Sequence, residues 1–352
     1  MKSKLCLLLC VLMAFPWCLT SCKKYESEIN VYNWGEYISD GSEDYLDVIK
    51  EFEMRYNIKV HYTEYDSNEY MYNVLKNNPG SSYDILIPSE YMVAKLIEED
   101  MIQKINFDNI PNYQYIDEKY KNLPFDPNNE YSVPYFAGTL GIVYNKTMVD
   151  EPVDSWSILW DEKYKEKIFM IDNSRDAFAV ALTVLGYDAN NCTEQQIDEA
   201  RDLLLKQRPL VYTYGMDQVF NCMEQDQCAL GVYYAGDAVT MMENNENLDF
   251  VVPKEGSNMF VDSIVIPKNA VNKEGAEKFI NFLLEPEIAA ANAEYVCYTS
   301  CNKASYELID EEIINDEIIY PDQSVYDRCF YFSNMEKSLY NYLQKAWILV
   351  QI

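Results

Sequence analysis

Apolar and polar positions alternate along the first third of the chain in two rhythms. Some runs alternate every second residue, as strands do, and others repeat their apolar residues at helical spacing. These rhythms predict strands at residues 28–34, 58–65 and 83–89 and helices at residues 43–57, 66–78 and 90–101. Repeated β–α–β units favour an α/β fold in which helices cover a mainly parallel sheet.

Two of these helices carry further local signals. In the first helix, the spacing places Tyr45, Val48 and Phe52 on one face, which we expect to be buried. At the start of the second helix, Asp66 and Glu69 have the spacing of a capping box. Both signals predict where the helices begin and which way they face.

The remaining two thirds of the chain begin irregularly and then return to the same pattern. Residues 106–129 lose periodicity and predict loops. After them we expect strands at residues 131–146 and 262–270, helices near residues 177–185, 194–206 and 335–352, and a helix pair at residues 273–295 divided at Pro286. We find no internal repeat and no low-complexity tract.

Aromatic and acidic residues follow two of the predicted strands directly. "WGEY", from Trp34 to Tyr37, ends the first strand, and "SEY", from Ser89 to Tyr91, ends the third. Ligands of parallel α/β sheets bind at the carboxyl ends of strands. Two rings and a carboxylate at such an edge fit either a packed core edge beside a solvated acid or part of a cage for an organic cation.

The amino terminus reads as an export signal. "MKSKLCLLLCVLMAFPWCLTSC" has a basic start, an apolar run too short to span a bilayer comfortably, and a lipobox-like ending. We therefore expect residues 1–21 to be a lipoprotein signal peptide, Cys22 to be lipidated, and residues 22–28 to be a polar tether. No later stretch is long and apolar enough to span a bilayer, so the body would be held outside the cell membrane by its lipid.

The charge and composition of the chain limit the kinds of partner that it can bind. The formal net charge is −30, which repels nucleic acid and attracts cations. Hydrophobic residues make up 49% of the chain and tyrosine occurs 31 times, so the chain is not a disordered acidic segment.

Histidine and cysteine usage limits the chemistry. His61, in an alternating stretch, is the only histidine, so a histidine-based catalytic centre or a multi-histidine metal site is disfavoured. Beyond Cys22, six cysteines could be free buried thiols or form disulfides whose connectivity the spacing does not give: Cys192, Cys222, Cys228, Cys297, Cys301 and Cys329. We expect no metal and no cofactor. Catalysis by paired carboxylates stays open, because acids are abundant.

Nine stretches, in order, resemble the polyamine-binding (spermidine/putrescine) proteins of bacterial ABC importers. They are "VYNWGEY", "YDSNEYMY", "YDILIPSEY", "PFDPNNEYSVPYFAGTLGIVYN", "SWSILWDEKYK", "LGVYYAGDA", "VPKEGSNMFVDSIVIPKNA", "GAEKFINFLLEPE" and "IIYPD". The resemblance implies a two-lobed, periplasmic-binding-protein-like fold (type II) with a ligand cleft between the lobes. Lobe 1 would comprise residues 29–135 with about 263–310, and lobe 2 residues 136–262 with about 311–352.

The resemblance also implies the site. Carried over by position, the ligand-binding residues would be Trp34, Glu36, Tyr37, Ser89, Tyr91, Asp176, Tyr234, Asp237, Phe260, Asp262 and Tyr298. Carboxylates suit the ammonium groups of a polyamine, and aromatic faces suit both its charge and its methylenes. In this family's pattern an acid often stands where this chain has Asn173.

The implied function is non-catalytic capture of spermidine or putrescine and its delivery to an ABC permease, without nucleic acid as a partner. Two alternatives stay open at this point. One is a receptor of the same fold for another small ligand, and the other is a surface hydrolase that uses paired carboxylates.

Overall fold

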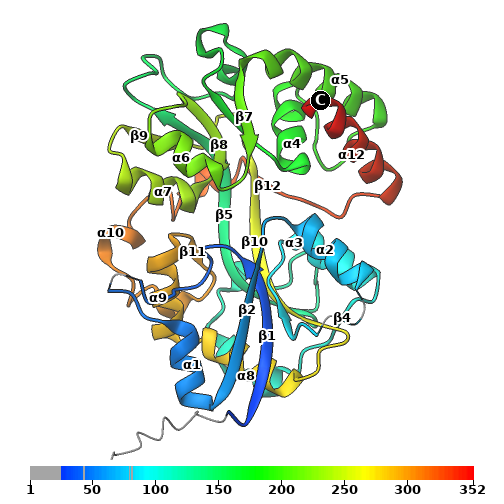
Figure 1. Ribbon diagram of the computed structural model, residues 1–352, viewed down its shortest axis with the longest axis vertical. Helices are drawn as coiled ribbons and strands as arrows, with labels where there is room; N and C mark the ends of the chain where they lie inside the picture. Colours follow the sequence, from blue (N-terminus) through cyan, green and yellow to red (C-terminus); the bar gives the residue numbers. More distant parts are fainter. Residues whose placement is uncertain (1–24, 43, 79, 81) are drawn as a thin grey trace, which may run out of the picture.

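Two long strands, β5 (Ser132–Asn145) and β10 (Asn258–Pro267), run side by side through the middle of the computed structural model and link two lobes (Figure 1). The structure describes residues 25–42, 44–78, 80 and 82–352. The expected signal peptide and Cys22 lie outside these residues. The two lobes confirm the predicted α/β class.

The first lobe is built on a sheet with the strand order β2–β1–β3–β10–β5. β1 pairs in parallel with β2 and β3, whereas β10 is antiparallel to β3 and β5. Its other elements are β1 (Ser27–Trp34), β2 (Ile58–Tyr65), β3 (Ile85–Leu86), β4 (Ile102–Gln103), α1 (Val48–Tyr56), α2 (Asn68–Asn77), α3 (Glu90–Glu98), α8 (Lys273–Leu283) and α9 (Pro286–Val296). Helices α1 and α8 meet through Phe52 and Phe279, whose ring centroids are 4.8 Å apart.

The second lobe continues from the far end of β5. There β5 is antiparallel to β8 and β9, while β6 pairs in parallel with β7 and β8. Its other elements are β6 (Ile168–Ile171), β7 (Val211–Gly215), β8 (Leu230–Tyr234), β9 (Leu248–Val251), α4 (Ser174–Val184), α5 (Glu194–Gln207), α6 (Gln218–Glu224), α7 (Ala235–Asn244) and α12 (Lys337–Gln351). Helix α4 is buried over most of its length, because α5 and α12 pack against it.

Short elements connect the lobes near the carboxyl end. They are β11 (Thr299–Ser300), α10 (Glu311–Ile314), α11 (Gln323–Tyr326) and β12 (Phe330–Tyr331). The strand β12 pairs with the start of β10, and the chain then passes to α12 in the second lobe (Figure 1). The predicted lobe boundaries near residues 135, 262 and 310 stay a prediction, since β5 and β10 continue through the first two.

Three local predictions are wrong. Residues 25–28 are not a tether: Tyr25 donates a hydrogen bond to Glu53 (2.8 Å) and β1 already begins at Ser27. Helix α1 begins at Val48, capped by Asp47, so Tyr45 lies before the helix and is partly exposed. The residues around Tyr45 have helical spacing, but the chain forms a turn there, before the helix begins.

The capping box of α2 is also wrong. Ser67 is the N-cap and accepts a hydrogen bond from the backbone N–H of Tyr70. The Glu69 carboxylate instead accepts hydrogen bonds from Tyr91 and Tyr340, each at 3.1 Å. Asp66 does not cap the helix, and it lines the cavity between the lobes.

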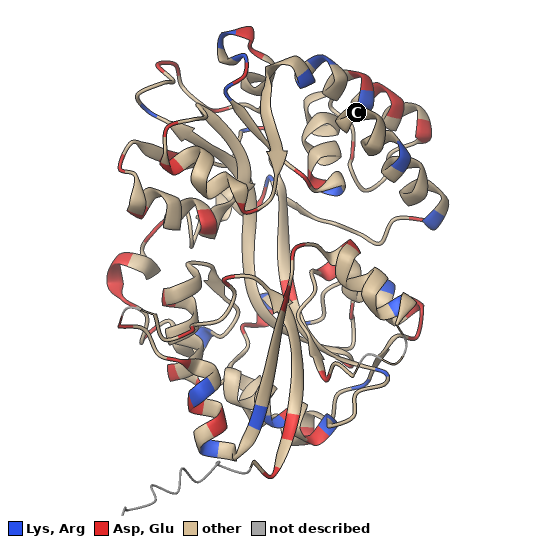
Figure 2. Ribbon diagram, in the orientation of Figure 1, with Lys and Arg blue, Asp and Glu red and all other residues tan. Residues whose placement is uncertain are grey.

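The six cysteines of the described chain are free thiols, five of them buried and Cys329 partly so. Of the two possibilities that the spacing left open, the structure has the thiols. Within the described residues, no helix is both long and apolar enough to cross a membrane. Acidic residues are spread over the helices and loops of both lobes, with Lys and Arg between them (Figure 2).

Candidate ligand-binding site

A cavity between the lobes gathers residues from strand ends and helix starts of both. Ten of the eleven predicted site residues line it: Trp34, Tyr37, Ser89, Tyr91, Asp176, Tyr234, Asp237, Phe260, Asp262 and Tyr298. Trp34 is the last residue of β1, Ser89 follows β3 as the N-cap of α3, and Asp176 and Asp237 lie in the first turns of α4 and α7. Phe260 and Asp262 lie on β10.

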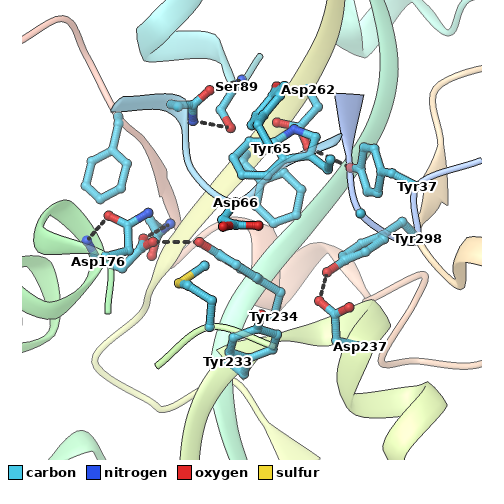
Figure 3. Close-up of a pocket in the computed structure, with 18 of the residues that line it drawn as sticks. Tyr37, Tyr65, Asp66, Ser89, Asp176, Tyr233, Tyr234, Asp237, Asp262 and Tyr298 are labelled. Atoms are coloured by element: carbon cyan, nitrogen blue, oxygen red, sulfur yellow. Dashed lines mark hydrogen bonds between the residues drawn. The ribbon is translucent and has the colours of Figure 1, made fainter. Parts of the chain in front are cut away.

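Three aspartates of the cavity each accept a hydrogen bond from a tyrosine (Figure 3). Tyr37 donates to Asp262 at 2.6 Å, and Tyr234 donates to Asp176 at 2.8 Å. Tyr298 donates to Asp237 at 2.5 Å. Each bond fixes one carboxylate oxygen and leaves the aspartate with further acceptor capacity toward the cavity.

Burial changes the acidity of these groups. Loss of solvent raises the pKa of Asp262 to about 6, although the hydroxyls of Ser89 and Tyr37 lower it. Burial likewise raises the pKa of Asp176 and that of Asp237 to about 7, against their tyrosine hydrogen bonds. The carboxylate form is disfavoured because its desolvation outweighs these hydrogen bonds and, for Asp176, the nearby charge of Arg175.

Rings form a continuous wall around these acids. Phe260 meets Tyr234 at 5.5 Å and Tyr298 at 5.6 Å between ring centroids, both nearly edge to face. Tyr298 in turn lies 5.7 Å from Tyr37. A Cβ atom at Gly236 would come within 2.7 Å of the Tyr298 ring, so the glycine leaves room for this wall.

The lining is strongly one-sided in charge. Six carboxyl groups contribute to it, and no Lys or Arg is among the described residues that line it. The six are Asp66, Glu90, Asp176, Asp217, Asp237 and Asp262. Acids and ring faces without an internal cation are a setting for an organic cation.

Glu36 is the predicted site residue that the cavity does not include. It follows Gly35 in the turn after β1, with a φ of 51°, and its side chain is exposed. The carboxylate accepts a hydrogen bond from Tyr295 at 2.9 Å. The turn therefore directs Glu36 outward, and only its neighbours Trp34 and Tyr37 reach the cavity.

A family model described as "Bacterial extracellular solute-binding protein" matches residues 47–321. The chain belongs to this family. It is 39% identical over 292 residues to the "Spermidine/putrescine-binding periplasmic protein" of Escherichia coli (strain K12) and to that of Salmonella typhimurium, covering 83% of this chain and 82% of each relative. It is 30% identical over 342 residues to a "Putrescine-binding periplasmic protein" of Pseudomonas aeruginosa, covering 92% of this chain and 91% of that one.

Solved structures of the solute-binding family have the same fold. A "Putative spermidine/putrescine ABC transporter" of Listeria monocytogenes superposes with a TM-score of 0.87 at 38% identity, covering 92% of this chain and 99% of that one. A spermidine/putrescine ABC transporter substrate-binding protein of Streptococcus pneumoniae gives 0.78 at 38% identity, covering 92% and 98%. The two-lobed solute-binding fold is thus confirmed.

Sequence reasoning missed half of the cavity of this solute-binding protein. The added lining residues are Gly35, Tyr65, Asp66, Asn68, Glu90, Asn173, Met216, Asp217, Tyr233, Asn258 and Phe332. Tyr65 and Asp66 could have been found from their place at the end of β2. Glu90 stands in the "SEY" stretch after the third predicted strand but was not among the predicted contacts, and Asn258 carried no such signal.

Glu90 is the most buried of these additions. Its side chain is 1% exposed and accepts hydrogen bonds from the backbone N–H groups of Val261 and Phe332, both at 3.2 Å. Burial raises its pKa to about 8, and the nearby charge of Asp262 adds to this, although Arg175 lowers it. Glu90 therefore ties the start of α3 to β10 and to the segment before α12.

The only histidine of the chain lies away from this site. His61 is exposed on β2, and its Nε2 lies 3.1 Å from a carboxylate oxygen of Glu28. In the described part of the chain, no group of three or more His, Cys, Asp or Glu side chains is placed to hold a metal ion.

Proposed function

We propose that this protein is an extracytoplasmic receptor that captures a polyamine, spermidine or putrescine, between its lobes and delivers it to an ABC permease. The observation that carries the proposal is the cavity itself, which has six carboxyl groups, a ring wall and, in the described part of the chain, no lining Lys or Arg. The names of the relatives point to the same ligands. The ten predicted residues that line the cavity are proposed as ligand contacts, and Glu36 is not.

The chemistry of the ligand fits this cavity. Each ammonium group would form charge-assisted hydrogen bonds with a buried carboxylate, which gains the cation that it lacks in the free protein. Methylenes would lie against rings such as Phe260 and Trp34. A sugar or an anion would leave the buried carboxylates without a cation, so a same-fold receptor for those ligands is disfavoured.

A calorimetric panel tests the proposal. Putrescine, cadaverine, spermidine, spermine, agmatine and two neutral sugars are titrated into the ligand-free protein. We expect saturable binding of spermidine or putrescine and no heat from the sugars. Equal, weak and salt-sensitive binding of all the amines would contradict a built site, since surface charge alone gives that result.

We propose that the protein does not transform its ligand. Asp176, Asp237 and Asp262 each accept a hydrogen bond from a tyrosine, and Glu90 accepts two backbone N–H groups, so these four carboxyl groups have structural partners. Ligand recovered from the complex after long incubation should be chemically unchanged. Conversion of spermidine, or cleavage of a glycoside, would favour the hydrolase alternative.

We also propose attachment to the membrane through lipid on Cys22, supported by the "LTSC" ending of the signal-like segment. Replacement of Cys22 by Ala should release the protein from the membrane fraction or leave it unprocessed. Processing and membrane fractionation like those of the wild type would contradict the lipid anchor.

A further inference from the structure

Two buried oxygen atoms of the cavity have no hydrogen-bond partner, and both belong to β10. They are Oδ1 of Asn258 and Oδ1 of Asp262, whose side chains are 3% and 4% exposed. Both residues line the cavity. Twelve buried side-chain atoms of the described residues have no partner, and these two are the ones that belong to the cavity lining, where a ligand can supply the missing donors.

The orientation of the Asn258 amide follows from its neighbour. Its Nδ2 donates a hydrogen bond to Asp176 Oδ1 at 2.9 Å, while Tyr234 occupies the other oxygen of Asp176. The reverse orientation would place the amide oxygen of Asn258 against a carboxylate oxygen. Oδ1 is therefore the free acceptor.

The strand sets the distance between the two oxygens. Residues two apart on a strand share a face, so Asn258, Phe260 and Asp262 lie in one row. The pairing with β5 is regular from Met259 to Asp262, and the bulge comes only after Asp262. Four residues of strand place the Cα atoms of Asn258 and Asp262 roughly 13 Å apart, with the Phe260 ring between them.

We propose that Asn258 Oδ1 accepts a hydrogen bond from one nitrogen of the ligand while Asp262 holds another, so that the ligand lies along β10 across Phe260. Asn258 is then a specificity-determining residue that selects for ligand length. The inference rests on the proposed function, because it requires a polyamine in the cavity.

Ligand lengths make the inference testable. Putrescine separates its nitrogens by five bonds, roughly 6 Å when extended, which is too short to reach both residues. Spermidine and 1,8-diaminooctane both separate their terminal nitrogens by nine bonds, roughly 11 Å, which matches the spacing once the side chains lean inward. The second compound lacks the middle nitrogen and therefore isolates length from charge.

The experiment compares Asn258→Leu with the wild type by calorimetry on these three ligands. We expect about tenfold weaker binding of spermidine and 1,8-diaminooctane, the loss typical of a hydrogen bond to a charged group. Putrescine binding should change by less than about twofold. The melting temperature of the ligand-free variant reports whether it folds, and Asn258→Ser is the second variant if the leucine prevents folding.

Tyr234→Phe is the matched control, since it removes the other donor to Asp176 but no cavity acceptor. We expect it to weaken all three ligands by a similar factor. If Asn258→Leu does the same, Asn258 acts only by positioning Asp176 and the inference is overturned. A wild type that binds none of the three ligands instead overturns the proposed function, and the inference with it.

Discussion

Two spaces between the lobes, the cavity and a groove beside it, are lined by the same kinds of side chain but differ in charge. The groove between α2, α3 and α12 is lined, like the cavity, by acids and rings, but it also contains Lys76, Lys95, Arg175 and Lys337. There Lys95 Nζ lies 3.8 Å from the Tyr72 ring centroid, and Arg175 lies 4.3 Å from that of Phe332. Among the residues that the structure describes, Lys and Arg line the groove but not the cavity.

This difference supports the cavity, and not the groove, as the proposed ligand site. In the groove, Glu99 accepts hydrogen bonds from Tyr72 and is paired with Lys76 at 3.3 Å, so its pKa is lowered. In the cavity, the pKa of Asp176 and that of Asp237 are raised to about 7. Acids and rings alone do not mark a binding site; acids and rings without an internal cation do.

The largest expected effect comes from removing a carboxylate of the cavity. Asp262→Asn keeps the size of the side chain but loses the charge that offsets desolvation of an ammonium group. Breaking such a buried charge pair costs about 2–5 kcal/mol, so spermidine binding should weaken by at least about thirtyfold. Calorimetry gives the affinity and a thermal melt checks the fold.

Glu98→Gln is the control from the groove. Glu98 is exposed and accepts a hydrogen bond from Asn334 at 2.5 Å, which a glutamine oxygen can also accept. Its neutralisation should change affinity by less than about twofold. Equal affinities of the Asp262 and Glu98 variants would contradict the assignment of the cavity.

A second prediction concerns a variant in which a cation is introduced into the cavity, so that the cavity resembles the groove. Met216→Lys places an ammonium group in the lining, where it would compete with the ligand for the acids. We expect spermidine affinity to fall by about 10- to 100-fold and the ligand-free protein to melt a few degrees higher at pH 8. Met216→Leu, which adds no charge, should resemble the wild type. An unchanged affinity in Met216→Lys would mean that the ligand binds elsewhere.

The pH dependence follows from the raised pKa values. An ammonium group needs ionised partners, so binding should release protons, and affinity should fall by at least about tenfold from pH 8 to pH 5.5, as Asp176, Asp237 and Asp262 become protonated. The stability of the ligand-free protein should depend on pH in the opposite direction to ligand affinity. The folded state holds these protons up to a higher pH than the unfolded state does, so the contribution of these groups to stability is lost as pH rises from about 4 to about 7. Calorimetry in buffers of different ionisation enthalpy counts the protons, and proton uptake on binding would contradict this account.

The smallest effect is expected from a groove cation. Lys95→Met keeps most of the packing between Tyr72 and Tyr340 but loses the charge. We expect ligand affinity within about twofold of the wild type and stability lower by about 1 kcal/mol, as for a partly buried cation–π pair. A loss of affinity as large as that of Asp262→Asn would erase the distinction between the two spaces.

The sequence predicted the order of strands and helices well in the first lobe, where the apolar rhythm is clear, but it did not predict the short elements β6 to β9, α6 and α7 of the second lobe one by one. The positions at strand ends, such as Trp34 and Ser89, came from that rhythm and the family resemblance together. Glu36 lies outside the cavity lining because it is itself a turn residue with positive φ, which no apolar rhythm predicts.

Other residues of the cavity could not be read from local pattern. Glu90 looks like any acid at the start of a helix, and its burial depends on Val261 and Phe332, which are far away in the sequence. Asn258 looks like a loop residue beside "EGS". Both residues take their roles from contacts with residues distant in the sequence, and such contacts leave no trace in the local pattern of apolar positions.

The continuity of β5 and β10 has a consequence for how the chain acquires its fold. The strands of the second lobe, from β5 to β9, lie within residues 132–251, so its sheet can assemble from one contiguous segment. The first lobe begins the chain, yet its sheet order places β10 between β3 and β5. The sheet of the first lobe therefore cannot be completed until β10 is synthesised, more than 170 residues after β3 ends. Non-local pairing of this kind is slow, so in an exported receptor, as proposed above, the lobe that is synthesised first would close late.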